Sequence, residues 1–369
     1  MLRPHRLAVG FYDEDPATGK IVRTDRFELD VDGESTVAAA AAGKKRPAFI
    51  LVNDDDLTYT KLRFDADSLS FALANLQRFD DAVVWLSLWD MTRDGDLAAE
   101  KFIDTTLALL ATETESTTFR YALSCMSTTA WHYTAPDRRA DVVKHVAKEL
   151  WKLVIAAPGG SDQQFQLVTA YLGYGEEGDA EFAEHAQGLF DGSLIVAGLE
   201  IDNNFTWTII NALSSVKLID QAGIDAQLAK RDTTENREFA LGAHAVRGDA
   251  AAKEWAWNEA LNNADLTNMQ LEAVARGFGA TPRPDLAEPY AAKYYDVVDW
   301  VWKNKSFHMA EALLEGLYPY YADPATLVEL GHRWLADHED ADNALKRIVR
   351  GNVESSQRTL KVRDFNAAL

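Results

Sequence analysis

The spacing of apolar residues changes once along this chain, close to residue 59, and this change limits what the chain can fold into. Before it, apolar and polar residues alternate, which is the pattern of a strand with one buried face. After it, apolar residues recur every three or four positions, which is the pattern of an amphipathic helix. The alternating positions are Leu7, Val9 and Phe11, then Phe27, Leu29 and Val31; the first helical positions are Leu69, Ala72, Leu73, Leu76 and Phe79, then Ala82, Trp85, Leu86 and Trp89. The sequence therefore predicts a small β domain over residues 1–58 and a large α-helical domain over residues 59–369.

The β domain is expected to be an incomplete sandwich. About four strands are predicted before residue 59, separated by turn-forming residues at 13–19 and at 32–33. The run Ala48–Val52 is apolar throughout, which fits a strand covered on both sides. Because a sandwich must fill two sheets, four strands are few for one. We therefore expect a partial sandwich with an edge strand near the N-terminus that lacks its partner.

The helical domain is predicted to contain about fifteen helices joined by short loops. Residues 221–246 and 250–278 each read as a helix, a turn and a second helix, so the repeat is about 30 residues long. Stacked helix pairs form a curved, superhelical solenoid with a concave face, as in HEAT and armadillo proteins. Helix ends are marked by predicted capping boxes at Ser161–Gln164 and Thr267–Gln270, by Asp323-Pro324 at a helix start, and by glycines at 95, 248 and 277–279.

Charge and cysteine content exclude several classes of protein. The formal net charge of −21 argues against a nucleic-acid partner, because phosphate binding needs a concentrated basic surface. No apolar run reaches about 18 residues and no secretory leader is recognisable, so neither a membrane span nor export is predicted. The single cysteine, Cys125, cannot form an internal disulfide, which favours a reducing, cytoplasmic location. Its apolar neighbours predict a buried side chain and not a catalytic thiol.

No catalytic, cofactor-binding or metal-binding residue is predicted in this chain. The zinc-binding string His-Glu-x-x-His is absent, and His308 with Glu311 lacks a second histidine, so this pair is interpreted as a surface contact. Residues 173–178 match the dinucleotide-binding string Gly-x-Gly-x-x-Gly. They follow a helical run and contain two glutamates, which predicts a helix–helix loop instead. The acidic run at residues 54–56 lacks the ligand spacing of a calcium loop and is interpreted as a turn.

Aromatic clusters are the remaining candidates for a binding role. Two tryptophans at i and i+2 cannot share one face of a helix, so one ring of each pair is expected to leave the main apolar stripe. Packing between helices is the favoured interpretation, and a ring that lines a ligand site is the alternative. The clusters are Trp255 with Trp257, Trp300 with Trp302, and Tyr318 with Tyr320 and Tyr321.

Two segments resemble a known family. AFILVNDDDLTYTKLRF, at residues 48–64, is followed by WLSLWDMTRDG at residues 85–95. Together they resemble the junction between the small β-sandwich and the C-terminal helical domain of the M1 zinc aminopeptidases, of the bacterial aminopeptidase N type found in high-GC Gram-positive bacteria. The resemblance extends over nearly the whole chain, and it implies a helical domain like that at the C-terminus of ERAP1. It also implies that the first sandwich strands lie upstream of residue 1.

The resemblance implies that this chain has a role but carries no catalytic residues of its own. In this family an upstream catalytic domain holds the zinc motif and a Gly-x-Met-Glu-Asn segment, and neither occurs in this chain. We therefore expect no cofactor in this chain and a zinc ion in the catalytic domain. We also expect the helical region to cap that domain and to enclose the peptide. The expected partners are the N-terminal and catalytic domains of the same polypeptide and the peptide substrate. A stand-alone helical-repeat scaffold for protein binding is the alternative that the periodicity also permits.

Overall fold

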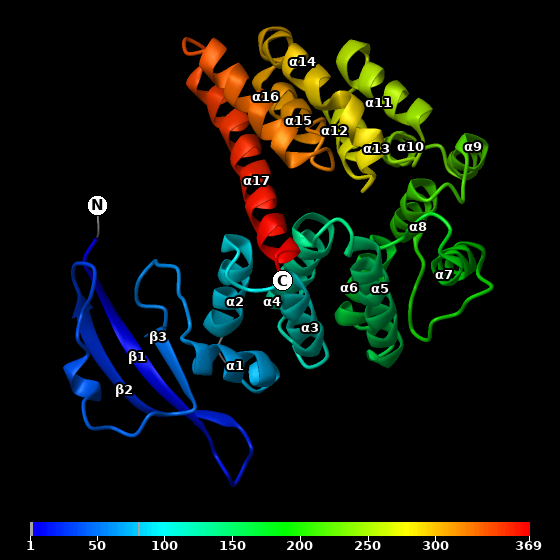
Figure 1. The fold of residues 1–369 in the computed structure, drawn as a ribbon. Helices are drawn as coiled ribbons and strands as arrows, with labels where there is room; N and C mark the ends of the chain where they lie inside the picture. The colour runs from blue at the N-terminus through cyan, green and yellow to red at the C-terminus, as the bar shows by residue number, and fades with distance from the viewer. Residues whose placement is uncertain (1–2, 80–81) are drawn as a thin grey trace. The chain divides into compact units, whose positions relative to one another are not determined.

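The computed structural model describes residues 3–79 and 82–369, and it divides into two compact units (Figure 1). Unit 1 comprises Met1–Val142 and Lys361–Leu369, and unit 2 comprises Val143–Leu360. Both are predominantly helical, and one small antiparallel sheet lies at the start of unit 1. The predicted fold class, mainly α with a small β part at the N-terminus, is confirmed. The predicted domain boundary at residues 58 and 59 stays a prediction.

The elements of unit 1 begin with three strands and continue as helices. The strands are β1 (His5–Glu14), β2 (Ile21–Val31) and β3 (Phe49–Asp54). The helices are α1 (Ala66–Asn75), α2 (Ala82–Asp94), α3 (Ala99–Leu110) and α4 (Ser116–Thr128), with 3-10 turns at Ala39–Ala41 and Leu76–Arg78 and a π-helical turn at Thr129–Tyr133. Helix α5 (Arg139–Ala156) leads into unit 2. The side chain of Ala82, a predicted apolar position, lies outside the described part of the structure.

Unit 2 continues with helices and no strand in its described residues. They are α6 (Asp162–Leu172), α7 (Ala180–Asp191), α8 (Asn203–Ser215), α9 (Gln221–Lys230), α10 (Thr234–Ala245), α11 (Ala250–Asn262), α12 (Asn268–Gly279), α13 (Pro284–Ala287), a 3-10 turn (Glu288–Tyr290), α14 (Ala291–Asn304), α15 (Phe307–Gly316), α16 (Pro324–Asp337) and α17 (Asn343–Ala367). The last residues of α17 belong to unit 1, where the Asn366 side chain accepts a hydrogen bond from the Ala99 amide at 2.8 Å.

The sheet has the strand order β2-β1-β3 and packs on both faces. One face carries the predicted alternating set on β1 and β2, which forms a cluster with Ile50. The opposite face carries Tyr12 and Phe49, whose rings pack against Phe79 from the segment that follows α1. Three strands are present in the described residues, whereas about four were predicted. The difference arises at residues 32–48, where no alternation of apolar and polar residues continues and a loop with one 3-10 turn forms.

The acidic run after β3 forms a turn, as predicted. The side chain of Asn53 closes it, accepting from the Thr58 amide at 3.0 Å and donating to the Thr58 carbonyl at 2.8 Å. Asp54 is fully buried and accepts hydrogen bonds from the Tyr12 hydroxyl at 2.5 Å and from Arg23 at 2.7 Å. Three residues of this turn have positive φ angles: Asn53 at 61°, Asp55 at 64° and Asp56 at 51°. Asn and Asp are the non-glycine residues that tolerate this conformation best, which explains their use here.

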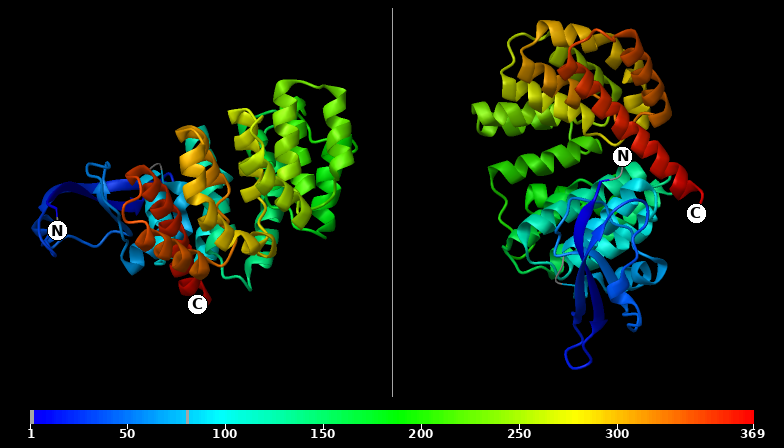
Figure 2. Two further views of the ribbon diagram at one scale, coloured as in Figure 1. Left: turned by 90° about the horizontal axis from the view of Figure 1, so that it is seen from above. Right: turned by 90° about the vertical axis from the view of Figure 1, so that its left-hand side faces the viewer.

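The helices of unit 2 stack as pairs in sequence order (Figures 1 and 2). One layer is formed by α6, α8, α10, α12 and α15, in which each helix packs against the next. Helices α7, α9, α11 and α14 each pack against a member of that layer. Members of the layer begin at residues 162, 203, 234, 268 and 307, so the repeat is about 30 to 40 residues long. The main core of unit 2 lies between the two sets of helices from α10 onward.

Most of the predicted helix ends are confirmed. Thr267 and Gln270 form a reciprocal capping box, and Asp323 caps a helix whose first residue is Pro324. Gly95, with a φ angle of 73°, follows the last residue of α2, and Gly248 lies in the turn after α10. In these places, local side-chain and backbone chemistry alone sets the boundary.

One of the predicted boundary signals differs from the structure, and one glycine signal has a second role. The Ser161 side chain accepts from the Gln164 amide, but the Gln164 side chain accepts from the Gly160 amide and not from that of Ser161, so the box is not reciprocal. Gly277 lies in the last turn of α12, which ends at Gly279, so the glycine signal at residues 277–279 is confirmed. A Cβ atom at Gly277 would lie 2.6 Å from the carbonyl oxygen of Gly242 on α10. This glycine is therefore needed for the close approach of the two helices.

Candidate functional site

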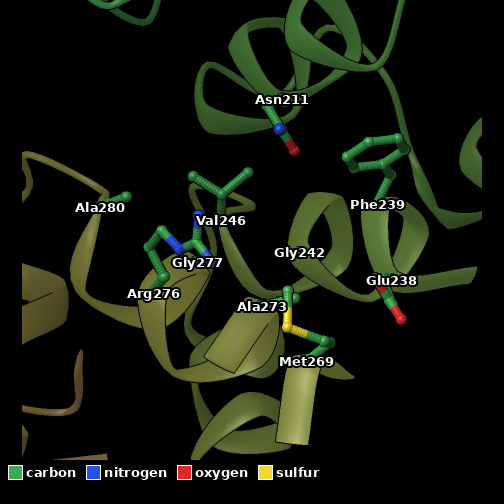
Figure 3. Close-up of a pocket in the computed structure, with 10 residues that line it drawn as sticks. All are labelled: Asn211, Glu238, Phe239, Gly242, Val246, Met269, Ala273, Arg276, Gly277 and Ala280. Carbon is green, nitrogen blue, oxygen red and sulfur yellow. The ribbon is translucent and has the colours of Figure 1, made fainter. Parts of the chain in front are cut away.

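One candidate site in unit 2 is a pocket where α8, α10 and α12 meet (Figure 3). Its volume is about 340 Å³, which lies in the range of small-ligand pockets. The close approach of α10 and α12 at Gly242 and Gly277 forms its floor, since neither residue carries a side chain that would fill it. The lining residues are Asn211, Glu238, Phe239, Gly242, Val246, Met269, Ala273, Arg276, Gly277 and Ala280.

Three polar side chains line the pocket beside mostly apolar residues. Asn211 reaches in from α8, and its Oδ1 atom is buried without a hydrogen-bond partner in the described residues. Arg276, in the last turn of α12, is exposed and forms no ion pair with any residue that the structure describes. Glu238 on α10 is half-buried and, in the same described part, also lacks an ionic partner. The pocket therefore offers one cation, one anion and one unused acceptor beside apolar surface.

A second hollow, of about 440 Å³, lies beside Arg276 between α12 and α15. Most of its lining residues are ionisable, namely Glu272, Arg276, His308, Glu311 and Glu315. The Nε2 atom of His308 lies 2.9 Å from the Oε1 atom of Glu272. The predicted surface contact between His308 and Glu311 is therefore replaced by a contact between helices, because α15 packs on α12 and brings Glu272 within reach.

Lys253 on α11 is a buried lysine that holds two helix ends together. Its Nζ atom donates to the carbonyl oxygens of Ala245, Gly277 and Phe278 at 2.7, 3.2 and 3.1 Å, and to the Thr281 hydroxyl at 2.5 Å. Burial lowers the pKa of Lys253 to about 7, although the negative charge of Asp249 acts in the opposite direction. Backbone carbonyls at helix ends attract a cation, so the ammonium group closes the ends of α10 and α12. We assign Lys253 a structural role.

Cys125 and the glycine-rich segment at residues 173–178 lie in surroundings that indicate a structural role for each. Cys125 is buried, and burial raises the pKa of its thiol to about 12, which leaves it unreactive at neutral pH. Residues 173–178 form the loop between α6 and α7, as predicted. In that loop Glu177 pairs with Lys217 at 3.0 Å and with Arg283 at 2.8 Å, so its carboxylate joins three loops of unit 2.

Three of the four paired tryptophans pack in the core of unit 2, and one ring of each pair leaves the main apolar stripe, as expected. Trp257 is buried against Phe278, whereas Trp255 leaves that stripe and stacks on His244 with 3.7 Å between the ring centroids. In the second pair, Trp300 is 43% exposed and Trp302 packs against Phe307. Tyr318 is fully buried, and Tyr320 packs against it. None of these rings lines the pocket of Figure 3.

The described side chains offer no group of ligands for a zinc ion. Within residues 3–79 and 82–369, no three His, Cys, Asp or Glu side chains converge in a way that could hold a metal. In the same ranges, no helix is long and apolar enough to cross a membrane.

Comparison with known proteins identifies the family. The chain is 33% identical over 371 residues to aminopeptidase N of Streptomyces lividans, an alignment that covers 100% of this chain and 43% of that protein. It thus spans less than half the length of that relative. The model of the ERAP1-like C-terminal domain matches residues 49–358. The resemblance to the C-terminal part of an M1 aminopeptidase, predicted from residues 48–64 and 85–95, is confirmed. The chain belongs to the ERAP1-like C-terminal domain family.

Proposed function

We propose that this chain is the non-catalytic C-terminal region of a zinc metallo-aminopeptidase of the aminopeptidase N type. In this proposal, a catalytic domain on the same polypeptide holds the zinc and releases N-terminal amino acids from peptides. The helical region caps that domain and encloses the chamber in which the peptide is bound. The partners are accordingly the N-terminal and catalytic domains and the peptide substrate, and the location is the cytoplasm.

The similarity to aminopeptidase N along the entire chain is the observation that carries the proposal. The sequence adds a consistent point, because it contains no His-Glu-x-x-His string with which to bind and activate a zinc-bound water. The stacked helix layer of unit 2 suits a wall, since helix pairs of this kind present extended surfaces to a neighbouring domain or ligand. We further propose that residues 1–58 are part of a β-sandwich and that residues 59–369 form the helical wall.

The test begins with the reading frame that encodes this chain. The proposal expects the frame to continue upstream and to encode His-Glu-x-x-His. The protein from the whole frame is then compared with a version that ends before residue 59, using aminoacyl para-nitroanilides and peptides of increasing length. If the helical region encloses the chamber, its removal changes the dependence of the rate on peptide length more than it changes the rate on the small substrates. Equal length dependence in the two proteins would contradict the proposed enclosure, and a frame without a peptidase motif would favour the scaffold alternative.

A further inference from the structure

Arg276, an exposed arginine of α12, has no ionic partner among the residues that the structure describes. The chain has 58 acidic and 37 basic residues, so carboxylates outnumber cations. The usual partner of Arg276 on its own helix is Glu272, four residues earlier, since side chains at this spacing are neighbours. Glu272 instead accepts from His308 on α15 at 2.9 Å. Arg276 therefore keeps an unused guanidinium group at the edge of the pocket between α8, α10 and α12.

The second observation is an unsatisfied acceptor in the same pocket. Figure 3 shows the Asn211 side chain extending from α8 toward the space between Phe239 and Val246. Its Oδ1 atom is buried and accepts no hydrogen bond from the described residues. A buried acceptor without a donor is costly, and a ligand that supplies an N–H group would remove that cost. Glu238 on α10 also lines the pocket, and its carboxylate favours a donor that carries positive charge.

The third observation is the apolar surface beside these groups. Phe239, Val246 and Met269 line the pocket, and Met269 is 52% exposed. A methionine and an aromatic ring form an adaptable wall for an aliphatic or aromatic side chain. Mostly apolar walls with a few convergent polar groups are typical of a small-molecule site.

We infer that this pocket binds a free apolar α-amino acid. The carboxylate of the ligand pairs with Arg276, its ammonium group donates to Asn211 Oδ1 and faces Glu238, and its side chain packs on Phe239 and Met269. The inference stands on the pocket of this chain and does not depend on the proposed aminopeptidase function. Its failure would leave that proposal untouched, because the two are tested on different molecules and with different measurements.

The binding test uses the whole 369-residue chain and isothermal titration with L-leucine. Two probes each remove one charge: L-leucinamide lacks the carboxylate, and N-acetyl-L-leucine lacks the ammonium group. We expect L-leucine to bind and both probes to bind at least about tenfold more weakly, since each loses a charge-assisted hydrogen bond. Equal binding of L-leucine and N-acetyl-L-leucine would overturn the assignment in favour of the carboxyl end of a peptide. Absence of L-leucine binding would overturn it outright.

Matched variants locate the site. Arg276→Gln and Glu238→Gln should each weaken L-leucine binding about tenfold or more and leave the thermal unfolding midpoint within a degree or two, because neither side chain has an ionic partner in the described structure. The controls are Arg350→Gln on α17 and Glu235→Gln on α10, two exposed residues outside the pocket, and both should bind like the parent chain. Binding that survives both pocket substitutions, or that falls equally with the controls, would place the ligand elsewhere and overturn the inference.

Discussion

Replacement of Lys253 by methionine tests how the helix ends of unit 2 are held. Methionine keeps much of the apolar stem but removes every donor from the Nζ position, where three carbonyl oxygens and one hydroxyl now accept. Each buried acceptor that finds no new donor costs ~1 to 3 kcal/mol. Relief from burying a charge offsets part of this loss. We therefore expect the free energy of unfolding to fall by about 3 kcal/mol at pH 7, in the range of the larger single-substitution effects.

The pH dependence of this effect follows from the lowered pKa of Lys253. The pKa is about 7 in the folded chain, where burial disfavours the charged form, and about 10.5 when unfolded. Between these values the unfolded chain binds more protons, so the stability of the parent chain rises with pH relative to that of the variant. At ~1.4 kcal/mol per pH unit, the difference between the two proteins should grow by about 2 kcal/mol from pH 7 to pH 9.

Urea denaturation followed by tryptophan fluorescence measures both the loss of unfolding free energy at pH 7 and the change of that loss with pH. Lys148→Met on α5 is the matched control, because Lys148 is exposed and its loss should change stability by less than about 0.5 kcal/mol. A Lys253→Met variant as stable as the parent would show that the four hydrogen bonds contribute nothing net. A difference that narrows as the pH rises would show that the helix ends stabilise the ammonium group more than burial opposes it, and this would refute the reasoning about the pKa.

Three further perturbations have expected outcomes. Asn352→Leu should lower the free energy of unfolding by about 1 to 3 kcal/mol in urea denaturation, because the Tyr320 hydroxyl loses its acceptor, whereas the Tyr294 hydroxyl and the Leu314 carbonyl keep the hydrogen bond between them; no loss would contradict the importance of that polar network. Gly277→Ala should cost about 1 to 3 kcal/mol by forcing a Cβ atom against the Gly242 carbonyl, and Gly351→Ala, where a Cβ atom meets open space, is the control that should cost nothing. The pKa of His132 is lowered to about 3 by burial and by Arg363, so acid destabilises the folded chain as the pH falls from about 6.5 toward 3. His132→Gln should flatten that fall in a pH series of thermal unfolding, and an unchanged slope would contradict the assignment.

Local signals in the sequence predicted much of the fold. The change from period two to a helical period placed the sheet before the helices, because side-chain direction follows backbone geometry directly. Thr267 and Gln270 form the expected capping box, because that motif depends only on residues three positions apart. The packing role of Gly277 could not be predicted for the opposite reason: it comes from Gly242 on another helix, which no local pattern reveals.

The candidate pocket could not be predicted from the sequence. Asn211, Glu238 and Arg276 lie on three different helices, and each looks like an ordinary surface residue in its own segment. Arg276 lacks its usual partner because the Glu272 carboxylate contacts His308 instead. That contact exists only because α15 packs on α12. A polar residue at the interface of helices can be recognised from periodicity, but whether its hydrogen-bonding capacity is used depends on tertiary packing.

Under the proposed function, the reacting centre of the aminopeptidase lies on residues outside this chain. The most direct measurement is the hydrolysis of leucine para-nitroanilide by the purified 369-residue chain during a titration with zinc. The account predicts that the rate stays at that of zinc in buffer at every metal concentration. A rate that rises with zinc, saturates at one ion per chain and is abolished by a chelator would contradict it.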